Sequence, residues 1–178
     1  MRTKLFTAGL ALVLVSACGS SSSSQAKTQS ANALNAAAAL AVAKPLTKAQ
    51  ALSVMHERHE GMEDVGKNNK VLRRELTAPS PDLLAVRAAA ATIARHSSEA
   101  AHWFPAGTGP DLGKTGAKPE IWQKPQDFGV KLHNFQVAAR AFDAAAKAGD
   151  LAAIKARYAD LSGTCKACHD TYRSEMHH

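Results

Sequence analysis

The sequence is poor in aromatic residues and contains only three cysteines. Phe, Trp and Tyr make up 5% of its 178 residues, although apolar residues as a whole make up 46%, with alanine supplying much of that share. A core with so few large side chains predicts a fold that depends on helix packing or on a bound group. Three cysteines are too few for a disulfide-dense scaffold, so that class of protein is excluded.

The apolar run near the N-terminus is short. It extends from Leu5 to Val15, which is not enough to span a bilayer, and it follows the positive charges of Arg2 and Lys4. This order of charge and apolar run is typical of a secretory signal. We therefore expect residues 1–17 to be a signal peptide and the mature protein to work outside the cytoplasm.

The residues at 15–18 resemble a bacterial lipobox, in which small residues precede a cysteine that becomes the lipidated N-terminus. The alternative is an ordinary signal, cleaved between Ala17 and Ala26, which would discard Cys18. The residue after the cysteine is Gly19 and not an aspartate, which resembles the signals of lipoproteins sorted to the outer membrane. We expect a periplasmic protein that a lipid on Cys18 anchors to the outer membrane, with a Ser/Ala-rich tether over residues 18–44.

The excess of positive charge is concentrated before the folded part of the chain. Lys and Arg number 22 against 15 Asp and Glu, which gives a formal charge of +7 and at first suggests an acidic partner. Four of the basic residues lie in the signal and the tether, namely Arg2, Lys4, Lys27 and Lys44. The remaining excess is small, and we predict no nucleic-acid partner.

Residues 45–178 show no strand alternation and are expected to form one domain of four helices. The apolar spacing predicts helices over about 47–76, 81–103 and 125–148, and a last helix that begins at Asp150. Thr47 and Asp150 are the predicted N-caps, and Gly149 is the predicted end of the third helix. Short turns separate the first two helices and the last two, whereas a Pro/Gly-rich connection joins the second to the third. The pattern predicts an all-α, antiparallel up-down four-helix bundle.

Apolar residues spaced by three and four define the inward face of each helix. On the last helix the same steps continue to both C-terminal cysteines, so these are expected on the core-facing stripe. The predicted inward residues are Leu52, Met55, Met62, Val65, Leu72 and Leu76 on the first helix, Leu83, Val86, Ala90, Ile93 and Ala94 on the second, Phe128, Leu132, Phe135, Ala139 and Phe142 on the third, and Leu151, Ile154, Tyr158, Leu161, Cys165, Cys168 and Tyr172 on the last.

The motif Cys165-Lys-Ala-Cys168-His169 has the spacing of a c-type haem attachment site. Two thiols one helical turn apart can each bond a haem vinyl group, and the next histidine can ligate the iron. A thioredoxin-like site would need a βαβ setting, and a disulfide between two cysteines so spaced on a helix is strained. A zinc site with His177 or His178 is the remaining alternative. The sequence predicts one covalent haem c on the last helix.

The position of this motif close to the C-terminus resembles the class II cytochromes c, the cytochrome c′ family, whose four-helix bundle carries the haem on its last helix. Residues 119–128 resemble the family's stretch that leads into the third helix. Arg58, Met62 and Gly66, each four residues apart, resemble the family's first-helix pattern. The resemblance extends over residues 45–176.

The resemblance implies roles for two residues of the first helix. Met62 matches the residue that faces the haem on the side opposite His169, and Arg58 matches an arginine near a haem propionate. Family members with a non-ligating residue at the Met62 position are five-coordinate and bind diatomic gases, whereas relatives with methionine there are six-coordinate electron carriers. From the residues alone, core packing remains the alternative for Met62, a solvated surface position the alternative for Arg58, and His59 a rival iron ligand.

The expected function is that of a monohaem cytochrome with iron ligated by His169 and Met62. It would carry single electrons between periplasmic or membrane redox proteins and would not be an enzyme. The alternative is a five-coordinate protein that binds nitric oxide or carbon monoxide. A haem-free zinc or interaction lipoprotein is a third hypothesis. The resemblance also allows a homodimer, since family members often dimerise.

Overall fold

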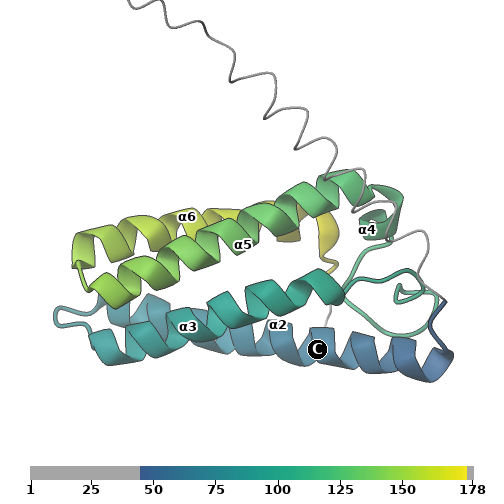
Figure 1. The fold of residues 1–178 in the computed structure, drawn as a ribbon, viewed down its shortest axis with the longest axis horizontal. Coiled ribbons are helices and arrows are strands. Elements are labelled where there is room, and N and C mark those ends of the chain that lie inside the picture. Colours follow the sequence, from purple (N-terminus) through teal and green to yellow (C-terminus); the bar gives the residue numbers. More distant parts are fainter. Residues whose placement is uncertain (1–44, 176–178) are drawn as a thin grey trace, which may run out of the picture. The chain divides into compact units, whose positions relative to one another are not determined.

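The computed structural model describes residues 45–175, and these form four long helices (Figure 1). The predicted signal peptide, Cys18 and the tether lie outside the described residues, as do His177 and His178. Within the described range there is no strand, only a single antiparallel bridge between Ala117 and Arg173. The long helices are α2 (Lys48–Thr77), α3 (Leu83–Glu99), α5 (Pro125–Ala148) and α6 (Leu151–Tyr172).

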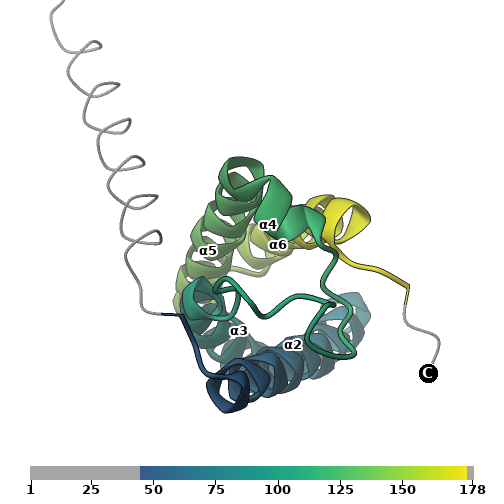
Figure 2. The same cartoon turned by 90° about the vertical axis from the view of Figure 1, so that its right-hand side faces the viewer.

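The helices follow one another up and down, as the sequence predicts. Helix α2 packs on α3, α3 on α5 and α5 on α6, whereas α2 and α6 have few direct contacts with each other. The view along the bundle in Figure 2 shows the connection between α3 and α5 crossing one end of the bundle. Figure 1 shows that α2 and α6 run in opposite directions. The predicted all-α, antiparallel four-helix bundle is confirmed.

The helix ends follow local sequence signals. The Thr47 side chain accepts a hydrogen bond from the Gln50 backbone and completes a capping box, and Asp150 caps α6. Gly149 ends α5 with a φ of 85°, a conformation that favours glycine. The second helix is shorter than predicted, because Asp82 caps it at Leu83 and its last turn narrows to a 3₁₀ helix, η1 (Ala100–His102).

The connection contains a short helix that the sequence analysis does not predict, α4 (Glu120–Gln123). Its start and end are marked by Pro119 and Pro125, which permit a single turn of helix between them. Among the described residues, no helix is both long enough and apolar enough to cross a membrane.

One predicted inward residue of α2 is not inward. Leu52 is 42% exposed, while its neighbour Ala51 and the residues Met55 and Arg58 are buried. The first turns of α2 face the connection instead of a neighbouring long helix, so the buried face shifts by one residue there. The main core, formed by all four long helices, contains Leu72, Leu76, Val86, Ala89, Ala90, Ile93, Phe135, Ala139, Phe142, Ala146, Ile154 and Leu161.

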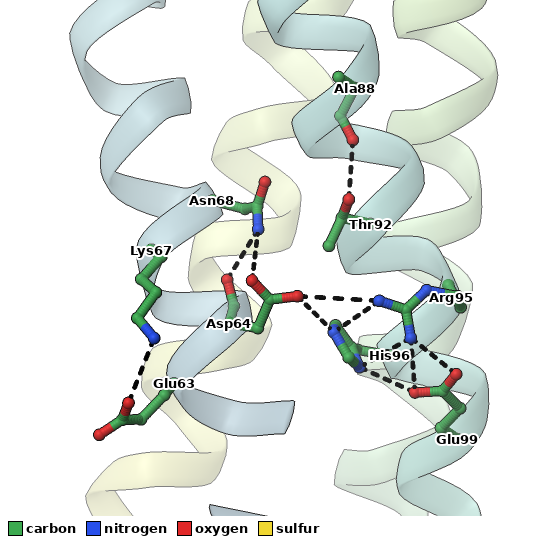
Figure 3. Close-up of polar contacts among 9 residues, drawn as sticks. All are labelled: Glu63, Asp64, Lys67, Asn68, Ala88, Thr92, Arg95, His96 and Glu99. Atoms are coloured by element: carbon green, nitrogen blue, oxygen red, sulfur yellow. Dashed lines mark hydrogen bonds and ion pairs between the residues drawn. The ribbon is translucent and has the colours of Figure 1, made fainter. Parts of the chain in front are cut away.

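A polar network joins α2 to α3 on the side of the bundle shown in Figure 3. His96 is buried, and its ring nitrogens lie 2.7 Å from Asp64 Oδ2 and 2.8 Å from Glu99 Oε2. The Arg95 guanidinium donates to Glu99 at 2.8 Å and lies 3.7 Å from Asp64. These contacts fix α2 against α3, and so fix the position of the α2 residues that face α6.

Candidate haem-binding site

Cys165 and Cys168 lie one turn apart on α6, and each packs against a different apolar cluster. Cys165 contacts the main core, and Cys168 contacts a smaller cluster of Ile121, Phe128 and Tyr172. Both cysteines are free and partly buried, and burial raises the pKa of each thiol. They are therefore protonated thiols held in place by packing, which differs from the exposed, low-pKa thiolate of a redox cysteine.

The smaller cluster anchors the end of α6 that carries the motif. The Phe128 ring packs edge-on against Phe104 at 4.8 Å and against Tyr172 at 5.3 Å. The Tyr172 hydroxyl donates to Asp127 Oδ2 at 2.5 Å, and burial together with this carboxylate raises the pKa of Tyr172 to about 12. The backbone of Lys118 also donates to the Tyr172 carbonyl at 2.9 Å. The last turn of α6 is thus tied to the connection and to α5.

His169 follows Cys168 on the last turn of α6 and is exposed at the protein surface. Partial desolvation of the ring and the nearby positive charge of Arg173 lower the pKa of His169. A lowered pKa favours the neutral imidazole that a metal ligand must be. His169 is therefore accessible and in the protonation state needed to bind iron.

The described residues do not support a zinc site at the motif. In the described range, one group of three metal-binding side chains has its ligand atoms within 4.8 Å of one another. It consists of His59, Glu60 and Glu63, and all three are exposed. The thiols of Cys165 and Cys168 and the His169 ring are not gathered in this way. In haem attachment each of the three makes a different bond, so the observed arrangement fits haem.

A hydrogen bond between α2 and α6 shows where Met62 lies along the length of the bundle. The Tyr158 hydroxyl donates to Asn69 Oδ1 at 2.7 Å. Met62 lies seven residues before Asn69, and Cys165 lies seven residues after Tyr158. Because the two helices are antiparallel, both steps go the same way along the bundle by roughly 10 Å. Met62 is therefore level with Cys165, across from the haem attachment site.

The packing of Met62 differs from that of a core methionine. Met55 is 8% exposed and belongs to the core, whereas Met62 is only partly buried and belongs to neither apolar cluster. The rival His59 is exposed and lies 3.3 Å from Glu63 on its own helix. Met62 shares its helix face with Asn69, which contacts α6, because seven residues make two helical turns. These positions favour Met62 over His59 as the residue directed toward the site.

Arg58, one turn before Met62, is buried, so the alternative of a solvated surface arginine is wrong. Its guanidinium donates to the connection: Nη1 to the carbonyl of Trp103 at 3.0 Å, and Nη2 to the carbonyl of Thr108 at 3.0 Å and to Thr115 Oγ1 at 3.0 Å. It also lies over the Phe104 ring at 5.1 Å. Arg58 thus holds the connection against α2.

The charge of Arg58 has no carboxylate partner among the residues described, because all its acceptors are carbonyl or hydroxyl oxygens. Burial lowers the pKa of Arg58 to about 10. A buried cation without a counter-ion is unfavourable, and a nearby anion would relieve this cost. The arrangement is compatible with a haem carboxylate close to Arg58, the role that the family resemblance implies.

Gly61 is a residue of this region whose importance the sequence alone does not indicate. It is buried, and a Cβ added there would overlap the Trp103 ring. Gly66, which the family pattern singles out, has no protein atom within 4 Å of such a Cβ. A glycine inside a 30-residue helix is unfavourable for the helix itself, but the sequence does not show that Trp103 is the residue that packs against it.

Comparison with known proteins agrees with this site. The sequence profile described as cytochrome c′ matches residues 53–173. Cytochrome c′ of Allochromatium vinosum is 32% identical over 122 residues, which are 66% of this chain and 78% of that protein. Cytochrome c′ of Thermochromatium tepidum has a known structure with a TM-score of 0.65 and 30% identity, covering 74% of this chain and all of that chain.

Two further solved structures describe ligand binding in relatives. A cytochrome c′ with ligand-controlled dimer dissociation is 28% identical, with a TM-score of 0.64, over 74% of this chain and all of that one. A nitric oxide complex of a cytochrome c′ variant from Alcaligenes xylosoxidans is 27% identical, with a TM-score of 0.61, over 70% of this chain and 97% of that one.

The haem belongs to these relatives and fits the residues present here. Haem c supplies one-electron and gas-binding chemistry at its iron when bound. In this chain Cys165 and Cys168 would hold it covalently and His169 would ligate the iron. The chain belongs to the cytochrome c′ family, and it is a monohaem c-type cytochrome with one covalently bound haem c.

Proposed function

We propose that this cytochrome binds a diatomic gas, nitric oxide or carbon monoxide, at its haem iron. The observation that carries the proposal is its membership of a family in which a relative has been solved with nitric oxide bound. A second relative changes its assembly under the control of a ligand. In the present chain, the gas would bind on the α2 side of the haem, because His169 of α6 would occupy the other side.

The packing around Met62 is compatible with gas binding. Met62 is partly exposed and belongs to neither apolar cluster, so the protein does not hold its thioether in a tightly packed position. An unbranched side chain with three rotatable bonds can move aside at small cost. We therefore infer that Met62 either stays off the iron or leaves it when a gas binds.

A specific observation favours a second function, electron transfer between periplasmic or membrane redox proteins. Met62 lies level with Cys165, as expected of an axial ligand opposite His169. A thioether is a soft, neutral ligand that favours ferrous iron and raises the reduction potential. With both axial positions filled by protein ligands, the iron would be six-coordinate and suited to carrying single electrons.

Absorption spectra of the ferric and ferrous holoprotein distinguish the two functions. A gas-binding protein whose Met62 stays off the iron should be high-spin, and Met62→Leu should change its spectra little. If Met62 is instead displaced by the gas, the parent should still bind carbon monoxide fully at micromolar concentration, and Met62→Leu should bind it at least as tightly. An electron carrier should be low-spin with the weak far-red thioether-to-iron band, and Met62→Leu should abolish that band. Met55→Leu, a buried methionine of the same helix, is the matched control and should leave every spectrum unchanged. Absence of a pyridine haemochrome would contradict both functions.

A further inference from the structure

We propose that a second pocket, between α2 and α6 and separate from the haem attachment site, binds a phosphate-bearing anion. The pocket has a volume of about 600 Å³. It lies near the end of the bundle where α2 finishes and α6 begins (Figure 1). Basic residues of both helices line it together with apolar side chains, and the main lining residues are Lys70, Arg73, Arg74, Leu76, Lys155 and Tyr158.

Three of the four basic residues that line this pocket have no carboxylate partner in the described part of the chain. No acidic side chain lines it. Arg74 pairs with Glu75 at 2.7 Å, but Lys70, Arg73 and Lys155 form no ion pair with any residue between 45 and 175. Three like charges facing one pocket repel one another, and an anion bound between them would remove that repulsion.

Several other lysines of the helices, in contrast, are paired with a carboxylate on their own helix. Lys67 lies 3.3 Å from Glu63, Lys147 lies 2.6 Å from Asp143, and Lys166 lies 2.6 Å from Asp170, each at a spacing of four residues. Such pairs are the usual way in which a helix surface balances its charge. The basic residues of the pocket instead have basic or uncharged neighbours at these spacings, as in Lys70 and Arg74.

The chemistry of the lining residues favours a phosphate group. Lys70, Arg73 and Arg74 share one face of α2, because they are three or four residues apart. A guanidinium offers paired N–H donors that match phosphate oxygens, and an ammonium adds a mobile point charge. Lys155 contributes from α6, on the other side of the pocket. The Leu76 and Tyr158 side chains add apolar surface to the lining, which suits the organic part of a small phosphate compound or a lipid.

The charge distribution along α2 argues against a long polyanion such as nucleic acid. The half of the helix before the pocket carries Glu57, Glu60, Glu63 and Asp64. A polymer that extended along α2 from the pocket would meet these carboxylates and be repelled. The site therefore suits a compact anion. A soluble phosphate compound and the headgroup of an anionic phospholipid both have this chemistry.

The binding experiment uses the holoprotein with Cys18→Ala, so that no lipid chain contributes to membrane binding. Isothermal titration with inorganic pyrophosphate at constant ionic strength should show one saturable site. Lys70→Gln combined with Arg73→Gln should weaken binding by at least about tenfold, because two charge-assisted contacts are lost. Lys67→Gln, three residues before Lys70 and already paired with Glu63, is the control and should bind as the parent does.

Sedimentation with vesicles identifies the source of the phosphate group. Binding to phosphatidylglycerol vesicles but not to phosphatidylcholine vesicles, lost in the Lys70/Arg73 double variant, would assign a lipid headgroup. Saturable pyrophosphate binding without vesicle binding would assign a soluble anion. The proposal is overturned if neither probe binds saturably, or if Lys67→Gln weakens binding as much as the double variant. Circular dichroism of each variant checks that the helices are intact.

Discussion

Gly61 of α2 lies directly against the Trp103 ring, so closely that any Cβ at position 61 would overlap the indole. Trp103 is itself 5% exposed, and its carbonyl accepts a hydrogen bond from Arg58. Gly61, directly before Met62, and Arg58, one turn before it, are therefore both in contact with Trp103 at the start of the connection. Trp103 and Gly61 together set how near the connection comes to the part of α2 around Met62.

Gly61→Ala should destabilise the protein, although alanine is the better helix former. The added methyl group must displace the Trp103 ring, and overpacking of this kind costs about 1–3 kcal/mol of unfolding free energy. Urea unfolding of the holoprotein, followed by circular dichroism, measures the change. Gly129→Ala on α5, where the added Cβ meets no atom within 4 Å, is the control and should be neutral or stabilising. A Gly61→Ala variant as stable as the parent would show that the ring can move freely.

Arg58→Lys should cost more stability than an exposed arginine replaced in the same way. A lysine keeps the charge but cannot reach the carbonyls of Trp103 and Thr108 together with the Thr115 hydroxyl, so buried acceptors lose their donor. The expected loss of unfolding free energy is about 2–3 kcal/mol. Arg157→Lys, at an exposed pair with Asp160, should change it by less than about 1 kcal/mol.

Two variants at Arg58 test the proposed link between this residue and the haem. If the guanidinium charge acts on a haem carboxylate, Arg58→Gln should shift the reduction potential while Arg58→Lys shifts it less, because lysine retains the charge. Equal potentials in the parent and both variants would leave Arg58 with a purely structural role in the connection. Potentiometric titration of the three proteins, with Arg157→Gln as control, makes the measurement.

Cys18→Ala should release the protein from the membrane fraction. The expectation follows from the lipobox-like residues at 15–18, because a lipid on an N-terminal cysteine would anchor the protein to a membrane. Fractionation of cells expressing the parent and the variant measures the distribution. The control variant Ser20→Ala, changed two residues after Cys18, should stay in the membrane fraction as the parent does. A Cys18→Ala protein that stays with the membrane would contradict lipid anchoring.

The parts of the fold that the sequence predicts are those set by local chemistry. Thr47, Gly149 and Asp150 define helix ends through contacts within four residues, and the apolar spacing of α5 and α6 identifies their buried faces. The attachment motif is equally local, because Cys165, Cys168 and His169 occupy little more than one turn.

The parts that the sequence does not predict depend on contacts between distant residues. Arg58 reaches partners 45 to 57 positions away, so nothing near it in the sequence indicates that it is buried. Leu52 has the spacing of a core residue, yet no long helix covers its end of α2. The glycine in contact with Trp103 could be recognised only once the connection was placed against α2.

Tyr172 should make the stability of the protein depend on pH in alkaline solution. Its pKa is about 12 in the folded protein, compared with about 10 for an unfolded tyrosine, because the ring is buried and its hydroxyl donates to Asp127. The folded state therefore holds its proton more tightly than the unfolded state. This contribution to stability is fully present below pH 10 and is lost as the pH rises toward 12.

Tyr172→Phe should have lower stability at pH 8, and the difference from the parent should shrink between pH 10 and pH 12. Urea unfolding at several pH values measures this difference, and subtracting the variant removes the contribution of lysines common to both proteins. A difference that stays constant over that range would show that the Tyr172 hydroxyl titrates alike in both states.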